Sequence, residues 1–337
     1  MDSRPRQPSF FSPAAMPGLR RVLATALLTL YPVAGAAAQG AIDPNIAPRA
    51  AALEREGERH MAIDLLGRYL ATAPDDGRAW LQLGRFYLHD ARDWHARGHG
   101  GEPDGLLYLD FAATALEQSI RLAVDSGLIF RGIVEVERGL VALEAAGWAE
   151  ARTGGGPDRA PHIPPYVLEL GENLLASCPA GGVLLTGSEL EALSVWYGSM
   201  ERPSLDVLPI RPDLYATDSL YRERMARAMG VNPALPVQRA LGDVAPRRTL
   251  CLSPTTDSAA VPALKWEPFR LVRISRPAGA GPEAMSITEL IKAARQSSSP
   301  WVLDVRGVYD RAAAHNLLLC SSLLLLFGDT PPPACRP

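Results

Sequence analysis

A regular spacing of small, aromatic and leucine residues between positions 62 and 87 constrains the fold more than any other feature of this chain. At three- and four-residue intervals, such residues lie on one face of a helix. A proline and the turn sequence Asp75-Asp76-Gly77 separate the two sets and predict a break between two helices. Small side chains would let the helices approach closely, and the larger ones would fill the seam between them. Seven residues form this pattern: Ala62, Leu66, Pro74, Trp80, Leu83, Gly84 and Tyr87.

This spacing resembles the tetratricopeptide repeat, whose frame is W-x2-L-G-x2-Y followed by A-x3-F and P, with Leu66 in the Phe position. A further match follows at Ala112, Leu116 and Val124, but 50 residues rather than 34 separate Ala62 from Ala112. We therefore expect an insert of about 16 residues, forming a polar, glycine-rich loop at 93–104, and a closing helix at 129–147. The resemblance implies a domain of helical repeats over residues 41–150 that binds a protein or peptide partner in a groove.

The N-terminus has the layout of a secretory signal peptide. Arg20-Arg21 precede the apolar run 22–30, and small residues ending at Ala38 follow Pro32. We expect cleavage after Ala38, with Met16 as an alternative start. An uncleaved membrane anchor is the other interpretation, but the apolar run falls short of the ~20 residues that a span needs. No cysteine follows the run, so we expect an exported periplasmic or secreted protein rather than a lipoprotein.

Four cysteines remain after the predicted cleavage site, an even number that permits two disulfides in an exported protein. Cys320 and Cys335 lie close in the sequence and would close a proline-rich loop, which would leave Cys178 to pair with Cys251. The sequence contains no C-x2-C pair, so these residues do not predict a zinc site.

Beyond a glycine- and proline-rich linker at 151–165, the pattern changes to alternating strands and helices. Apolar runs at 182–186, 205–210, 248–252 and 269–274 predict strands, with helices at 188–200 and 218–229. This order predicts a parallel sheet. The expected fold class is thus α plus α/β: helical repeats, then a small Rossmann-like three-layer α/β domain at 166–337. A buried helix from about 309 to 327 would end it, because its apolar part at 317–327 is too short to span a membrane.

Residues 174–274 also resemble another family, through Gly187, Trp196-Tyr197, Arg202 and Asp206-Val207 in this order. They resemble the soluble C-terminal domain of bacterial membrane proteins related to protein O-mannosyltransferases, in which G-D-x-D, W-Y and R-x-D-V follow a strand. This chain departs from that pattern, since Ser188 and Glu189 follow the glycine and the many membrane helices are missing. The resemblance therefore implies a shared accessory domain and not the glycosyl-transfer activity.

The candidate ligand site is the turn between the first predicted strand and its helix. The helix N-terminus there could bind an anion, and Trp196 could stack on a sugar. The alternative is structural: Ser188 caps the helix with Glu191 as its capping-box partner, and Trp196-Tyr197 pack in the core or at a domain interface. The residues concerned are Gly187, Ser188, Glu189, Glu191 and Trp196.

One polar cluster, His89, Asp90, Asp93, His95 and His99, has the character of metal ligands, but nearby glycines predict a solvated loop. We expect no metal, no cofactor and no assigned catalytic residue, since the sequence contains no G-x-S-x-G, G-x-G-x-x-G, P-loop or H-E-x-x-H motif.

The net charge is −3 and the arginines are scattered, so nucleic-acid binding is not predicted. We expect an exported interaction scaffold. The alternative is an envelope accessory or enzyme with a glycan or sugar phosphate as its partner.

Overall fold

The computed structural model describes residues 42–98, 101–153, 163–277, 285–321, 323 and 333–336, which belong to one compact unit, Ile42–Pro337. The predicted signal peptide, most of the predicted linker and the apolar residues 324–327 lie outside the described residues. In the parts of the chain that are described, every helix is too short or too polar to cross a membrane.

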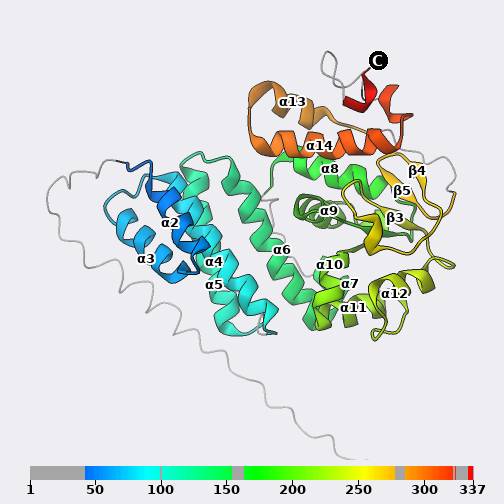
Figure 1. The fold of residues 1–337 in the computed structure, drawn as a ribbon, viewed down its shortest axis with the longest axis horizontal. Coiled ribbons are helices and arrows are strands. Elements are labelled where there is room, and N and C mark those ends of the chain that lie inside the picture. The colour runs from blue at the N-terminus through cyan, green and yellow to red at the C-terminus, as the bar shows by residue number, and fades with distance from the viewer. Residues whose placement is uncertain are drawn as a thin grey trace, which may run out of the picture. The chain divides into compact units, whose positions relative to one another are not determined.

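The N-terminal half consists of helices joined by short connections, as predicted. Helix α4 contacts both α2 and α6, so the first helices of successive pairs lie side by side (Figure 1). Helices α3 and α5 complete the two pairs, and α6 takes the place of the predicted closing helix. The helices are α2 (Ile46–Arg55), α3 (Arg59–Leu70), α4 (Gly77–Ala96), α5 (Pro103–Arg121), α6 (Ser126–Ala146) and α7 (Trp148–Thr153).

The predicted close approach of helices occurs at Gly84 on α4. A Cβ atom placed there would lie 2.6 Å from Cγ of Leu116 and 3.3 Å from the carbonyl oxygen of Ala112, both on α5. Ala62 and Leu66 are fully buried in the seam of the first pair. These small and apolar positions fix how the helices pack, because a larger side chain at Gly84 would push α4 and α5 apart.

Three of the seven frame residues lie nearer to the surface. Leu83 is buried, whereas Trp80 and Tyr87 are half-buried and Pro74 is exposed. The expectation that Pro74 ends a helix is wrong, since α3 already ends at Leu70. The Pro74 carbonyl instead accepts a hydrogen bond from Nε1 of Trp80 at 2.8 Å, which fixes the entry to α4.

The predicted insert is not mainly a loop. Helices α4 and α5 contain 20 and 19 residues, against 10 and 12 in α2 and α3, so most of the insert lengthens the second pair. Residues 93–96 therefore belong to α4. The added turns are helical because they continue the seam: Ala91 and Leu109 are buried there, and the rings of Trp94 and Tyr108 pack 6.3 Å apart.

The C-terminal half contains a five-stranded sheet in the order β2-β1-β3-β5-β4. Strand β1 runs parallel to β2 and β3, as predicted, but β5 is antiparallel to both β3 and β4. The expectation of an all-parallel sheet is therefore wrong at this edge. Only Arg270 and Leu271 separate β4 from β5, and so short a connection makes a hairpin rather than a parallel crossover. The strands are β1 (Val183–Leu185), β2 (Leu208–Ile210), β3 (Leu250–Leu252), β4 (Glu267–Phe269) and β5 (Val272–Ile274).

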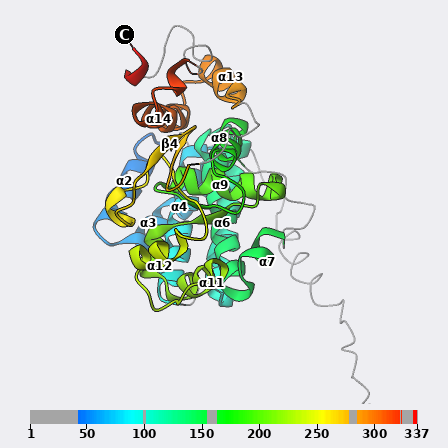
Figure 2. The same cartoon turned by 90° about the vertical axis from the view of Figure 1, so that its right-hand side faces the viewer.

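Helices pack against this sheet and against the repeats. Helices α8 and α9 lie side by side, and α9 contacts α6 (Figure 2). A single cluster of buried apolar residues extends from Leu88 to Cys335, while a smaller one joins α2, α3 and the first half of α4. The division into two domains at 151–165 stays a prediction. The helices are α8 (Pro165–Ala176), α9 (Glu189–Glu201), α10 (Pro212–Thr217), α11 (Ser219–Met229), α12 (Val237–Val244), α13 (Thr288–Gln296) and α14 (Pro300–His315), with 3-10 turns η1 (Pro203–Leu205), η2 (Ser258–Ala260) and η3 (Pro333–Cys335).

The predicted buried helix from about 309 to 327 is displaced. Helix α14 begins at Pro300 and ends at His315. Leu317 and Leu318 follow in a turn and are 67% and 86% exposed, so the expectation that they are buried is wrong. The cause is Asn316, whose side chain accepts a bond from the Leu318 N–H at 3.3 Å and donates to the Arg270 carbonyl at 3.0 Å.

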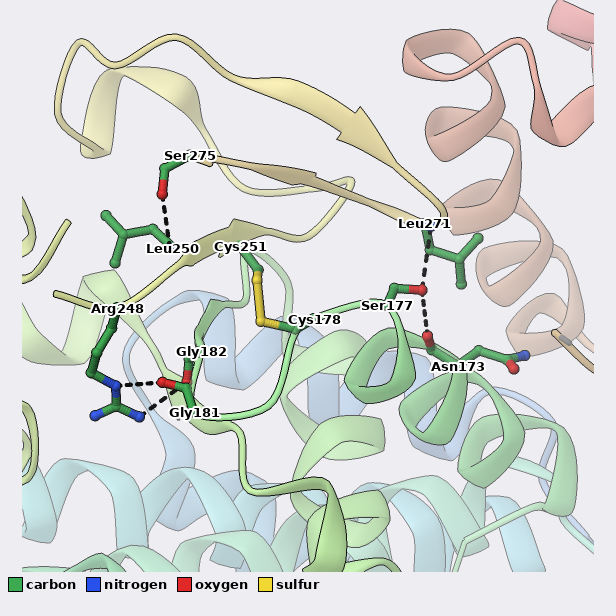
Figure 3. The surroundings of a disulfide bond; sticks show 10 residues. All are labelled: Asn173, Ser177, Cys178, Gly181, Gly182, Arg248, Leu250, Cys251, Leu271 and Ser275. Carbon is green, nitrogen blue, oxygen red and sulfur yellow. Dashed lines mark hydrogen bonds between the residues drawn. A yellow bond between two sulfur atoms is a disulfide. The ribbon is translucent and has the colours of Figure 1, made fainter. Parts of the chain in front are cut away.

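The four cysteines lie at bonding distance in the two predicted pairs. The Cα atoms of Cys178 and Cys251 are 5.9 Å apart, and those of Cys320 and Cys335 are 5.2 Å apart. Figure 3 shows the first pair joining the end of α8 to β3, beside Arg248, which donates to the Gly181 carbonyl at 2.6 Å. This bridge connects the helical layer to the centre of the sheet.

Candidate functional site

One row of side chains runs along the face of α4 that lies between α2 and α6. Its members are three or four residues apart, and none of them is buried: Arg78 is exposed, and the others are half-buried. We call this set the α4 row, and it consists of Arg78, Leu81, Arg85, His89 and Arg92.

The first part of the α4 row carries positive charge without matching carboxylates. The Arg85 guanidinium lies 4.9 Å from the ring centroid of Phe130 on α6. Its Nη1 donates to Oε1 of Gln82 at 3.4 Å, and its Nε is buried with no hydrogen-bond partner among the described residues. Among the described residues, no carboxylate pairs with Arg78 or Arg85. His89, by contrast, lies 2.5 Å from Oε1 of Glu54 on α2. Two guanidinium groups on the row thus have no carboxylate partner in the described part of the chain.

The other end of the row is closed by the C-terminal half of the protein. Nε of Arg92 donates to Oε1 of Glu137 on α6 at 2.7 Å, and its Nη2 bonds Glu189 at the start of α9. Burial lowers the pKa of Arg92, but the two carboxylates outweigh it and raise that pKa overall. Arg92 therefore stays charged and links the repeats to the sheet-containing half.

A cavity of about 570 Å³ lies beside Arg92, bounded by α4, α6 and α9 to α11. On its wall, Nε2 of His95 lies 2.5 Å from Oε1 of Glu144 and 3.2 Å from Oδ2 of Asp218. The bonds to Asp218 and Glu144 raise the pKa of His95 to about 10. Burial opposes ionisation of Asp218, yet its bond to His95 holds its pKa near 2. Burial raises the pKa of Glu144, although its bond to His95 opposes the rise.

The histidine cluster predicted from the sequence is only partly brought together. Asp90 and Asp93 bind Arg59 at 2.9 and 2.6 Å, away from His95, and His99 lies outside the described residues. The partners that His95 does have, Glu144 and Asp218, are 49 and 123 residues away in the chain. The local signal that could have placed His95 on a helix is the continuing three- and four-residue spacing of the α4 row.

The predicted ligand turn after β1 is filled by the chain itself. Ser188 caps α9 by accepting the Glu191 N–H at 3.2 Å, as the structural alternative predicts. The fully buried carboxylate of Glu191 accepts bonds from the Gly187 N–H at 3.1 Å, from Ser253 Oγ at 2.5 Å and from the Thr255 N–H at 3.2 Å. A Cβ atom on Gly187 would collide with the Thr255 backbone. A ligand role for this turn stays a prediction.

Trp196 is 6% exposed and packs at the contact between α9 and α6. Its ring covers Gly139 so closely that a Cβ there would overlap the indole, and Trp148 meets its edge at 5.6 Å. This is the interface packing that the sequence offered as the alternative to a sugar platform.

A model of the tetratricopeptide repeat family matches residues 47–86, which cover α2, α3 and the first half of α4. Comparisons with curated proteins and with solved structures gave no match. The resemblance of residues 174–274 to the O-mannosyltransferase-related proteins therefore has no support from these comparisons. The chain contains a tetratricopeptide repeat, and such repeats generally bind protein partners.

Proposed function

We propose that this protein is an exported interaction scaffold that binds an acidic segment of a partner protein along the α4 row. The observation that carries the proposal is the pair of guanidinium groups, Arg78 and Arg85, that lack carboxylate partners among the described residues. Both lie on the face between α2 and α6 of a matched tetratricopeptide repeat. Arginine forks recognise carboxylates in a defined geometry, so an acidic peptide fits this surface.

The chemistry of the rest of the row agrees with a peptide ligand. Leu81 lies between the two arginines and offers an apolar contact. The ring of Phe130 holds the Arg85 guanidinium through a cation–π contact. At the far end, Arg92 is already neutralised by Glu137 and Glu189. A bound segment would therefore extend from Arg78 toward His89 and end where α9 begins.

Site-specific photocrosslinking in intact cells tests the proposal. A photoreactive residue at Leu81 keeps both arginines and lies within the row. The matched control places the same residue at Met61 on α3, which is 55% exposed and lies on the second helix of its pair. We expect a discrete adduct from position 81 that is absent from position 61. No adduct, or the same adducts from both positions, would contradict the proposal.

Export rests on the predicted signal peptide, and the two cysteine pairs are compatible with an oxidising compartment. N-terminal sequencing of the protein recovered from the envelope or medium should begin at or near Gln39. An intact terminus at Met1 or Met16 in the membrane fraction would overturn the proposed cleavage.

A further inference from the structure

We propose that His95, Glu144 and Asp218 form a binding site for a divalent metal ion of the zinc class. One ligand atom from each residue lies within 4.8 Å of the other two. The three come from different elements, namely α4, α6 and the residue that caps α11.

The spacing of the atoms suits a metal ion. Zinc binds nitrogen and oxygen ligands at about 2.0–2.2 Å in a tetrahedral arrangement, so neighbouring ligand atoms lie about 3.5 Å apart. Nε2 of His95 and Oδ2 of Asp218 are 3.2 Å apart. Oε1 of Glu144, now 2.5 Å from Nε2, would need to withdraw by about 1 Å to reach that spacing.

Asp218 is held in a way that is typical of a supported ligand. Its Oδ1 accepts the backbone N–H groups of Leu220 and Tyr221 at 2.9 and 3.0 Å, as the N-cap of α11. Its Oδ2 is thereby directed toward His95. Hydrogen bonds of this kind orient a carboxylate before the metal binds, which lowers the entropic cost of ordering that side chain.

The donor set selects the class of ion. One imidazole nitrogen with two carboxylate oxygens suits zinc, whereas magnesium and calcium prefer oxygen ligands throughout. The trio lines the cavity of about 570 Å³, so a fourth position would open to water or to an anionic ligand. Arg92 and Arg211 line the same cavity, and each is held there by its own carboxylate partners, Glu137 and Glu189 for Arg92 and Asp213 for Arg211. Because zinc binds a neutral imidazole, binding would release the Nε2 proton of His95 to solvent.

Zinc titration of the full chain, after treatment with a chelator, tests the site. We expect one zinc ion per chain and a higher melting midpoint when zinc is present. Asp218→Asn should bind zinc at least tenfold more weakly, yet still cap α11, because asparagine and aspartate are equally good caps. His95→Gln should behave likewise. X-ray absorption of the bound zinc should report nitrogen and oxygen ligands.

His89→Gln is the matched control, because His89 also lies 2.5 Å from a glutamate but contacts one carboxylate rather than two among the described residues. Its zinc affinity should equal that of the unsubstituted protein. Failure of the unsubstituted chain to bind zinc would overturn the proposal, and so would unchanged affinity in both Asp218→Asn and His95→Gln. If His95→Gln does not fold, Asp218→Asn decides.

Discussion

The two helix pairs follow one sequence frame but differ in length. The comparison shows which residues pack the two helices of a pair together and which residues connect a pair to the rest of the protein. In the first pair, α2 and α3 contain 10 and 12 residues and enclose a small apolar cluster. In the second pair, α4 and α5 contain 20 and 19 residues, and the added turns bring Arg92 and His95 to α6, α9 and α11. The frame residues thus set how neighbouring helices pack, whereas the inserted turns set what the pair contacts.

The seams of the two pairs also differ in chemistry. Ala62 and Leu66 make the first an apolar seam. The contact of the long pair with α6 is ionic as well: Arg138 of α6 binds Asp110 of α5 at 2.5 Å, and Arg131 of α6 binds Glu117 of α5 at 3.3 Å. Salt should therefore weaken the contacts of the long pair with α6, whereas in the short pair it acts on the Arg59–Glu54 ion pair at 3.3 Å and not on the apolar seam.

The largest loss of stability is expected from reduction of the cysteines, none of which lies in the two helix pairs. Cys178–Cys251 closes a loop of 73 residues, worth about 4 kcal/mol in the chain-entropy model, and Cys320–Cys335 closes 15, worth about 3 kcal/mol. Reduction should loosen the C-terminal half first, and Cys335→Ser should do so locally. Hydrogen exchange in the helix pairs should change last. Free thiols at 320 and 335 in the non-reduced protein would refute the second bridge.

The second-largest loss of stability is expected from a substitution between α4 and α5, the helices of the long pair. Gly84→Leu should destabilise the protein by roughly 1–3 kcal/mol or more, because the new side chain overlaps Leu116. Gly67→Leu on α3 is the matched control, since a Cβ there meets nothing within 4 Å. Thermal unfolding of both variants measures the difference. Equal melting midpoints would mean that α4 and α5 are not in close contact.

A loss of stability of comparable or smaller size is expected from a substitution in the added turns of α4. Arg92→Met should cost about 1–3 kcal/mol, because it leaves the carboxylate of Glu137, which is 9% exposed, without its partner. Arg92→Met with Glu137→Gln should recover part of the loss in a double-mutant cycle. Arg68→Met on α3 is the control, since Arg68 bonds only its own helix among the contacts described. A loss as large at Arg68 would remove the distinction between the pairs.

The smallest effect is a pH dependence at Glu135. Burial alone would raise its pKa, but Arg131 and Arg138 outweigh burial and lower it below the ordinary value. A carboxyl whose folded pKa is lowered stabilises the fold above its unfolded pKa of about 4.3, and this contribution is lost as the pH falls through the folded pKa. Glu135→Gln should therefore flatten the stability profile below about pH 4.3. A profile identical to that of the unsubstituted chain would rule out this contribution.

The sequence predicted what depends on neighbours in the chain. Helix spacing, the cap of α9 and the Cys320–Cys335 pair follow from short-range patterns, and the Cys178–Cys251 pair followed because only these two cysteines remained. The close contact of helices at Gly84 was also predicted. The β4–β5 hairpin was missed because its two-residue turn at Arg270-Leu271 contains no glycine to signal it. His95 was assigned to a loop because of the glycines that follow it, although it lies in α4. Its partners, Glu144 and Asp218, could not be predicted because only the folded chain brings them to it.

The most direct test of the central claim is the affinity of the partner captured at Leu81 for charge-reversed protein. Arg78→Glu with Arg85→Glu reverses the two charges of the α4 row that have no carboxylate partner among the described residues. Arg227→Glu on the exposed face of α11 is the control. We predict that the double variant binds the partner at least tenfold more weakly, a loss of about 1.4 kcal/mol or more, while Arg227→Glu binds as the unsubstituted protein does. Unchanged affinity in the double variant, with both proteins folded, would contradict the account.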